Sequence, residues 1–337
     1  MTLELLIASR RLREAIRERA PALVRTRRPT FALAAPPPRA PNDGQAAGQA
    51  EEGRGRGGGP PLARSPEAAS ARHRTTPPPA QAAAAAAAAH RSLLSSPAQD
   101  DSRLPRKALY RQRAHSNPLQ DAHFPVPAAP AAVDWASLYP EAFAAAAAAG
   151  APPPAVAFAD VGCGFGGLTV RLAEAYPDKL VVGMELRDKV CEYVQRRVAA
   201  LRVKEPGKFA NAACVRANAM KHIAHFFKRG QLEKLFFLFP DPHFKAANHR
   251  RRIVQTTLLA EYAYLLKPGG MVYTITDVED LGAWMAAKLA AHPLFERVGD
   301  AELAGDAAAG LLVGGTEEGQ KVARNGGRTW RAVFRRV

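Results

Sequence analysis

Apolar runs alternate with amphipathic stretches from about residue 133 to the end of the chain. Short apolar runs predict strands over 155–162, 180–186, 212–218, 232–239 and 271–277, and an alternating stretch over 328–337 predicts a last strand. Helical periodicity predicts helices over 168–176, 188–203, 249–266 and 278–292, and a helical turn or two over 220–227. KPGG (267–270) predicts the end of the preceding helix, followed by a turn. Strands that alternate with helices in this way predict an α/β fold with a mostly parallel sheet and helices on both faces.

The first 105 residues follow no such pattern. They are rich in Ala, Pro, Gly, Arg and Ser and nearly lack aromatic residues, so we expect a disordered low-complexity extension. One stretch, 3–20, fits a short basic amphipathic helix. Two alternatives explain this N-terminal segment. It could be a transit peptide, although three glutamates argue against that, or it could come from a gene model that starts too early.

A transitional segment covers residues 106–150, and we expect it to pack on the domain that follows while staying partly flexible. Trp135, Leu138, Tyr139 and Phe143 have helical spacing, and APPP (151–154) ends the segment. It also contains Ser116 in an R-x-R-x-x-S pattern, which basophilic kinases favour. Phosphate there would add nearly two negative charges to a basic region, so Ser116 is a candidate regulatory site. The domain that follows is expected to span 151–337.

The charge of the chain points to polyanionic partners. The formal net charge is +16 and the pI is about 10.2, and residues 106–337 remain basic without the extension. Nucleic acid is the partner class that this balance favours before membrane, although a solvated basic surface explains the charge equally well.

The three cysteines have no metal-ligand spacing, which suits a reducing compartment, and no apolar run reaches the roughly 18 residues of a membrane span.

A glycine-rich turn follows the first predicted strand. ADVGCGFGG contains Gly162, Gly164 and Gly167 in the G-x-G-x-x-G pattern, which lets a nucleotide-like ligand approach the backbone closely. The pattern does not distinguish nucleotide ligands, and a tight strand-to-helix turn without a ligand is the alternative.

Polar residues end the next two predicted strands. Glu185 can accept both hydroxyls of a ribose, a device that NAD enzymes and S-adenosylmethionine enzymes share, and Arg187 follows it. Asn218 can read an adenine edge through its amide, or can simply cap the following helix. All three are expected at the edge of the sheet where α/β proteins bind ligands.

The fourth predicted strand ends in LFFLFPDPHF (235–244), with one carboxylate between two prolines. The prolines limit the backbone around Asp241, which lowers the entropic cost of orienting a substrate. A functional role for Asp241 is therefore favoured over a mere turn.

These stretches together resemble one family. FADVGCGFGG, VVGMELRDKVCEYVQRR, ANAMKH, KLFFLFPDPHFK, YTITDV and GTEEG are similar to the tRNA (guanine-N7-)-methyltransferase family, in its eukaryotic catalytic-subunit form, from about residue 106 to 337. The resemblance implies a class I S-adenosylmethionine-dependent methyltransferase fold, Rossmann-like, with seven strands and the last one antiparallel. It implies N7 of a guanosine in the tRNA variable loop as acceptor and a non-catalytic WD-repeat subunit as partner in a heterodimer. We also expect a nuclear location, alone or with a cytoplasmic pool.

The resemblance also implies roles for individual residues. Asp241 is the implied active-site carboxylate. The implied cofactor contacts are Gly162, Gly164, Glu185, Arg187, Asn218, Ala219, Leu238, Thr316 and Glu318. Lys245 and Asp277 are implied on the substrate side, and Arg250, Arg251 and Arg252 are expected to hold phosphates. The chain departs from the family pattern at Ala246, Ala247 and Asn248, where members usually carry basic residues, which puts the strength of phosphate contact there in doubt.

Several other readings stay open at this point. His222 and His225 have spacing that suits a metal, but no third ligand is apparent, so no metal site is expected. Methyl transfer to N7 of other RNAs, an amino-group methyltransferase, a nicotinamide dehydrogenase and an inactive RNA-binding scaffold are the rival functions. Amino-group enzymes carry a second proline where this chain has His243.

Overall fold

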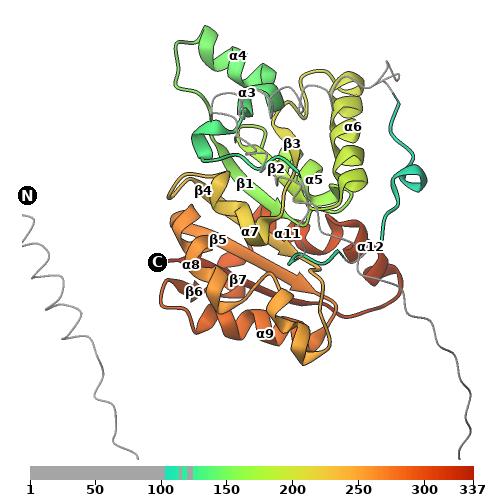
Figure 1. Cartoon of the computed structure of the whole chain (residues 1–337), viewed down its shortest axis with the longest axis vertical. Coiled ribbons are helices and arrows are strands. Elements are labelled where there is room, and N and C mark those ends of the chain that lie inside the picture. Colours follow the sequence, from blue (N-terminus) through green and yellow to red (C-terminus); the bar gives the residue numbers. More distant parts are fainter. Residues whose placement is uncertain (1–102, 114–115, 120–123) are drawn as a thin grey trace, which may run out of the picture. The chain divides into compact units, whose positions relative to one another are not determined.

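The sheet that the alternating pattern predicts is present in the computed structural model, which describes residues 103–113, 116–119 and 124–337 (Figure 1). All of these residues belong to one compact unit. The disorder predicted for 1–105 and the amphipathic helix over 3–20 lie outside the described residues, except for residues 103–105.

Seven strands form a single sheet in the order β3-β2-β1-β4-β5-β7-β6. The strands are β1 (Val156–Val161), β2 (Leu180–Glu185), β3 (Ala212–Arg216), β4 (Leu232–Leu238), β5 (Leu266–Thr276), β6 (Phe295–Arg297) and β7 (Trp330–Arg336). The first five pair in parallel, and β7 is antiparallel to both β5 and β6. The strand order reverses between β1 and β4, so the carboxyl ends of these strands form the edge at which a ligand is expected.

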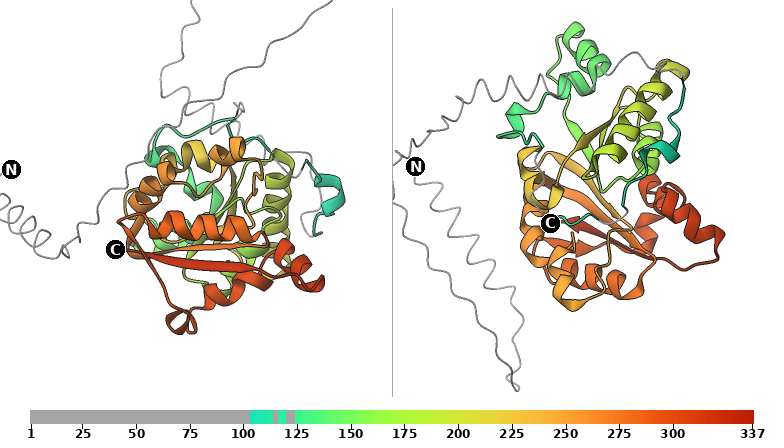
Figure 2. Two further views of the ribbon diagram at one scale, coloured as in Figure 1. Left: turned by 90° about the horizontal axis from the view of Figure 1, so that it is seen from below. Right: turned by 45° about the vertical axis from the view of Figure 1, so that its right-hand side comes forward.

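Helices cover both faces of the sheet (Figure 1 and Figure 2). One apolar cluster joins the sheet to α5 (Gly167–Ala175), α6 (Asp188–Lys204) and α11 (Ala307–Gly314). The other joins it to α7 (Ala219–His222), α8 (Thr256–Leu265) and α9 (Glu279–Ala290). Neighbouring residues within a strand, such as Phe236 and Phe237, belong to opposite clusters, because successive strand side chains point to opposite faces.

Two predicted boundaries are wrong. The helix predicted over 249–266 begins only at Thr256, and residues Ala246–Arg251 form the 3-10 helix η4. Gln255 is extended, and the carbonyl groups of Ile253 and Val254 accept hydrogen bonds from Tyr262 and Trp284, which holds the intervening chain out of a helix. KPGG lies within the bounds of β5, but the register jumps from Leu266 opposite Leu232 to Met271 opposite Lys234. The predicted turn is therefore present as a bulge inside the strand.

The segment before β1 is tied to the sheet by polar and aromatic contacts. It contains η1 (Lys107–Tyr110), η2 (Pro130–Ala132), α3 (Trp135–Leu138) and α4 (Pro140–Ala148). Tyr139 is fully buried and its hydroxyl donates to the Val181 carbonyl at 2.9 Å, while Trp135 stacks on Phe227. Arg202 of α6 donates to the carbonyl groups of Leu138 and Ala212, which joins α3 to the outermost parallel strand.

The C-terminal part contains elements that the pattern did not predict. The short strand β6 and the helices α10 (Asp300–Leu303), α11 and α12 (Glu317–Arg324) lie between α9 and β7. Residues 301–315 are rich in Ala and Gly with little periodicity, so they give a weak helical signal.

Candidate active site

The glycine-rich turn has a backbone that only glycine adopts readily. Gly162, Gly164 and Gly166 have φ of 74°, 55° and 75°. A Cβ at Gly162 or Gly164 would meet no atom within 4 Å, whereas one at Gly166 would lie 2.6 Å from Val194 Cγ1. The first two glycines therefore present backbone to open space, and the third allows close packing against α6.

Glu185 lies beside this turn and is nearly completely buried. Its Oε2 accepts from the Gly164 amide at 3.1 Å and from Arg187 Nη2 at 2.9 Å. Its Oε1 accepts from the Arg187 amide and from Arg187 Nε. Burial would lower the pKa of Arg187, but the hydrogen bond and charge of Glu185, with a further contribution from Asp241, raise it. These groups therefore form one electrostatic unit at the carboxyl edge of the sheet.

Asp160 in β1 is a third acidic group under the turn, and the sequence reasoning missed it. It is 2% exposed and accepts a hydrogen bond from Thr169 Oγ1 at 2.8 Å. Burial raises its pKa to about 7, and the charges of Glu317 and Glu185 add to that shift. An acid inside a run of six buried strand residues was the available signal, since buried carboxylates are rare.

The C-terminal loop brings Glu317 to the turn. Thr316 caps α12 by accepting from the Gly319 amide at 2.9 Å. The Glu317 carboxylate accepts from Arg197 Nη1 and Lys107 Nζ, and its Oε2 lies 2.5 Å from the place that a Cβ on Gly167 would take. Glu318 differs from its neighbour, because its side chain is 64% exposed and pairs only loosely with Lys321 at 3.7 Å. The carboxylate that lies at the glycine turn in this structure is thus Glu317, and the predicted cofactor contact of Glu318 stays a prediction.

A buried polar group anchors the segment that carries this loop. Asp306, the N-cap of α11, accepts from both Lys234 Nζ at 3.1 Å and Tyr176 at 3.2 Å, and Tyr273 also donates to it. Burial would raise the pKa of Asp306, but the hydrogen bond from Tyr273 and the charge of Lys234 lower it. The hydrogen bonds of Asp306 with Lys234 and Tyr273 fix α11 to β4 and β5, and so position the chain that leads to Glu317.

Asn218 follows β3 at the carboxyl edge of the sheet, and the predicted cofactor contacts Ala219 in α7 and Leu238 at the end of β4 are both buried. The Asn218 side chain does not cap α7; its Nδ2 donates to the Pro118 carbonyl at 2.7 Å. Ser116, two residues before Pro118, is partly buried. The segment that contains the kinase pattern therefore contacts the predicted adenine side of the site.

The loop after β4 holds Asp241 in a strained backbone. Phe239 and His243 have φ of 49° and 46°, although neither is glycine. Conformations of this kind cost on the order of 1–3 kcal/mol each and persist only where the surroundings enforce them. The Phe239 amide donates to the Ile275 carbonyl at 2.8 Å, and Arg252 Nε donates to the Pro242 carbonyl at 2.9 Å. Two neighbouring elements thus brace the loop around Asp241.

The predicted substrate-side residues divide into two groups. Lys245, Asp277 and Arg250 are exposed, and Arg251 is partly buried. Arg252 is only 5% exposed, and its guanidinium lies 4.7 Å from the Trp284 ring centroid. In this structure Arg252 is therefore buried and supports the Asp241 loop, and its predicted phosphate contact stays a prediction.

The three thiols lie together beneath the turn. Cys214 Sγ is 3.8 Å from Cys163 Sγ and 3.6 Å from Cys191 Sγ, and all three cysteines are free and buried. Among the described residues, no group of three His, Cys, Asp or Glu side chains is arranged to hold a metal ion. His222 and His225 pack edge to face, and His225 Nδ1 is hydrogen-bonded to the Pro127 carbonyl at 2.8 Å.

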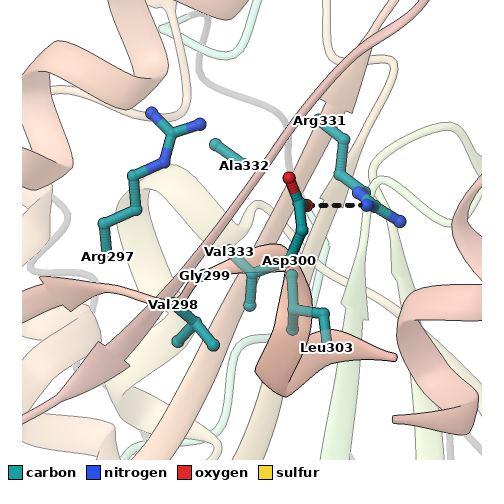
Figure 3. A pocket seen from close by; sticks show the side chains of 8 residues that line it. All are labelled: Arg297, Val298, Gly299, Asp300, Leu303, Arg331, Ala332 and Val333. Atoms are coloured by element: carbon teal, nitrogen blue, oxygen red, sulfur yellow. Dashed lines mark hydrogen bonds and ion pairs between the residues drawn. The ribbon is translucent and has the colours of Figure 1, made fainter. Parts of the chain in front are cut away.

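A hollow of about 240 Å³ lies along β7, on the far side of β4 and β5 from the glycine turn (Figure 3). Arg297, Arg331 and Asp300 line it, and Asp300 is paired with Arg331 at 3.0 Å. No predicted site residue lines this hollow, so it is separate from the candidate site. In the part of the chain that the structure describes, no helix is long and apolar enough to cross a bilayer.

Comparison with known proteins agrees with the geometry. A family model described as a putative methyltransferase matches residues 154–332. The tRNA (guanine-N(7)-)-methyltransferase of Arabidopsis thaliana is 57% identical over 69% of this chain and 92% of its own length. That of Danio rerio is 53% identical over 69% of this chain and 96% of its own length.

Among solved structures, the aminoglycoside resistance methyltransferase NpmB1 matches 55% of this chain and 88% of its own length. The TM-score is 0.36 and the sequence identity is 17%, so this likeness is too distant to bear on function. The two relatives, in contrast, match over nearly their whole length at more than 50% identity. This chain therefore belongs to the tRNA (guanine-N7-)-methyltransferase family.

Proposed function

We propose that this chain transfers a methyl group from S-adenosylmethionine to N7 of a guanosine in tRNA. The observation that carries the proposal is a proline-braced carboxylate, Asp241, electrostatically coupled through Arg187 to the Glu185 that adjoins the glycine turn. The family match spans all of these residues.

The residues at the turn fit a cationic nucleoside-like cofactor. Gly162 and Gly164 leave open space above the backbone, and the charges of Glu185 and Glu317 act on Asp160 across the turn. When bound, S-adenosylmethionine supplies a methyl group on a positively charged sulfur. Acidic groups around the turn favour such a charge over an anion.

The Glu317 carboxylate at the glycine turn argues against a nicotinamide dehydrogenase. Dinucleotides place their pyrophosphate at the N-terminus of the helix that follows the glycine turn. Here the Glu317 carboxylate lies against Gly167, the first residue of α5. A pyrophosphate in that position would meet a carboxylate, so a sulfonium cofactor is the better match.

Ribose recognition by Glu185 requires an exchange of partners. Its two oxygens already accept four hydrogen bonds, two of them from the Arg187 side chain, which fills the usual capacity of a carboxylate. Ribose hydroxyls can bind only in place of the Arg187 guanidinium. The Arg187 guanidinium then leaves Glu185, while the charge of Asp241 still favours its protonated form.

Asp241 then has an orienting role. Guanine N7 carries a free lone pair, so no proton is removed before methyl transfer and no strong base is needed. The carboxylate of Asp241 can accept from the guanine N1–H and exocyclic amine, which fixes the angle at which N7 meets the methyl group. Alignment of this kind supplies up to about 7–11 kcal/mol in favourable cases.

The exposed cations next to the loop suit the RNA backbone. Lys245 and Arg250 are exposed, with Arg251 partly so, and we assign phosphate contacts to these three. Such contacts make affinity fall steeply with salt concentration.

The finer assignments are proposals of the same kind. The acceptor is a guanosine of the variable loop, a non-catalytic WD-repeat subunit completes the enzyme, and the enzyme is nuclear. Phosphate on Ser116 lowers activity, because Ser116 lies two residues from the carbonyl that engages Asn218.

The proposal is tested by transfer of labelled methyl groups to tRNA, with and without a WD-repeat subunit. Asp241→Ala should lose transfer while it keeps affinity for S-adenosylhomocysteine, because Asp241 acts on the guanine. Normal turnover in this variant would overturn its role, and stabilisation of the chain by NAD but not by S-adenosylhomocysteine would favour the dehydrogenase. An inactive scaffold would bind tRNA with no transfer in any combination.

A further inference from the structure

The loop that holds Asp241 ends in an unusually exposed aromatic ring. Phe244 is 76% exposed, more than any other large apolar side chain in the described part of the chain. It directly follows His243, whose left-handed backbone turns the chain, and Arg252 fixes the carbonyl of Pro242 just before it. A braced and strained loop thus keeps a large apolar side chain in solvent, an arrangement that folding alone does not favour.

The surroundings of Phe244 combine apolar surface with positive charge. Ala246 and Ala247 are exposed beside it, and Lys245 and Arg250 are exposed on the same stretch. Proteins that distort nucleic acids insert apolar side chains between bases, and aromatic rings next to cations stack on bases regardless of sequence. The tip of this loop therefore has the chemistry of a stacking element.

The spacing along the chain suits this role. Phe244 lies three positions after Asp241, so their Cα atoms are at most about 11 Å apart. Successive bases in a stack are about 3.4 Å apart, so the ring can reach the neighbours of a guanine that Asp241 holds. A base that leaves its stack costs a few kcal/mol, and the gap that it leaves exposes apolar base faces.

We propose that Phe244 enters the gap that the target guanine leaves and stacks on the adjacent bases, which stabilises the extruded state. This inference rests on the proposed function and assigns to Phe244 a positioning role in it.

The test uses the full chain together with its WD-repeat subunit and two RNAs. One is a tRNA with 2-aminopurine beside the target guanosine, whose fluorescence reports loss of stacking. The other is the same tRNA with abasic sites on both sides of the target, which leaves no stack to open. Tyr264→Ala is the matched control, because Tyr264 is an exposed aromatic residue on α8. Its backbone carbonyl accepts from the Gly230 amide, which precedes β4, so Tyr264 is at the opposite end of β4 from the Asp241 loop.

Phe244→Ala should lower kcat/KM on the intact tRNA by about 10-fold to 100-fold, the range that loss of one base–aromatic stack produces. Phe244→Trp should restore most of the rate, Tyr264→Ala should change little, and affinity for S-adenosylhomocysteine should stay unchanged. On the abasic RNA, wild type and Phe244→Ala should differ by less than about 2-fold, since no stack remains to fill.

Three results would overturn the inference while the proposed function stands: no loss on intact tRNA, an equal loss on both RNAs, or loss of the WD-repeat subunit from Phe244→Ala during purification. The last result would assign Phe244 to a protein interface. Absence of transfer by the wild-type enzyme to intact tRNA would instead refute the proposed function itself.

Discussion

Replacement of Asp160 by asparagine should stabilise the cofactor-free chain at neutral pH. Asp160 is buried, and its pKa in the fold is about 7, against an ordinary value of 3.8. The fold therefore favours the protonated acid. Its stabilising contribution is fully present below about pH 4 and is lost as the pH rises to about 7.

The magnitude follows from the shift of about three pKa units. Each unit corresponds to about 1.4 kcal/mol, so ionisation of Asp160 lowers the free energy of unfolding by about 4 kcal/mol at and above pH 8. Asparagine has nearly the same shape and no charge, and its side-chain oxygen can still accept from Thr169 Oγ1. The protonated aspartic acid and the asparagine both carry one polar hydrogen-bearing group, so the two proteins should have similar stability at low pH.

The assay is urea unfolding of wild type and Asp160→Asn at pH 5, 6, 7 and 8 without cofactor. The advantage of the variant should grow by about 3 kcal/mol between pH 5 and pH 8 and then level off. Comparison of two proteins at each pH cancels the titration of groups that do not interact with Asp160. A difference that stays constant with pH would refute the reasoning, because it would mean that Asp160 keeps the same charge in the folded and unfolded chains.

Three further changes should have distinct effects. Gly166→Ala should lower the free energy of unfolding by at least about 1–3 kcal/mol in urea titrations, because the new Cβ meets Val194 at a φ of 75°; an unchanged midpoint would show that the turn relaxes freely. Asp306→Ala should cost up to about 3–5 kcal/mol, since it leaves the partly buried Lys234 without its acid, and Lys234→Met in the same chain should recover much of that loss; no recovery would exclude the ion pair as the cause. Glu185→Gln should weaken S-adenosylhomocysteine binding by roughly 10-fold or more in calorimetry through loss of charge-assisted hydrogen bonds, and equal affinity would remove Glu185 from ribose recognition.

The parallel core of the fold was predictable because its strands are continuous apolar runs. The runs that became β1, β2 and β4 are buried along most of their length, and β1 and β2 are each followed by an amphipathic helix, α5 and α6. The glycine turn was predictable for a local reason, since three positive φ angles within five residues admit few other residue types.

Contacts between distant parts of the chain were not predictable in the same way. Glu317 and Glu318 are adjacent and chemically identical, and only the position of α12 decides which carboxylate reaches the glycine turn. Arg252 resembles its neighbours Arg250 and Arg251 in sequence, yet the packing of Trp284 buries it under the Asp241 loop. Asn218 binds the Pro118 carbonyl from a segment 100 residues away, which no local pattern encodes.

The measurement that bears most directly on the central claim is the position of the transferred methyl group. tRNA incubated with the enzyme and S-adenosylmethionine is reduced with borohydride and treated with aniline, which cleaves the chain at N7-methylguanosine. The account predicts cleavage at one guanosine of the variable loop with wild type and none with Asp241→Ala. Methyl label that enters tRNA without any aniline-sensitive site, or cleavage that persists at full yield in Asp241→Ala, would contradict it.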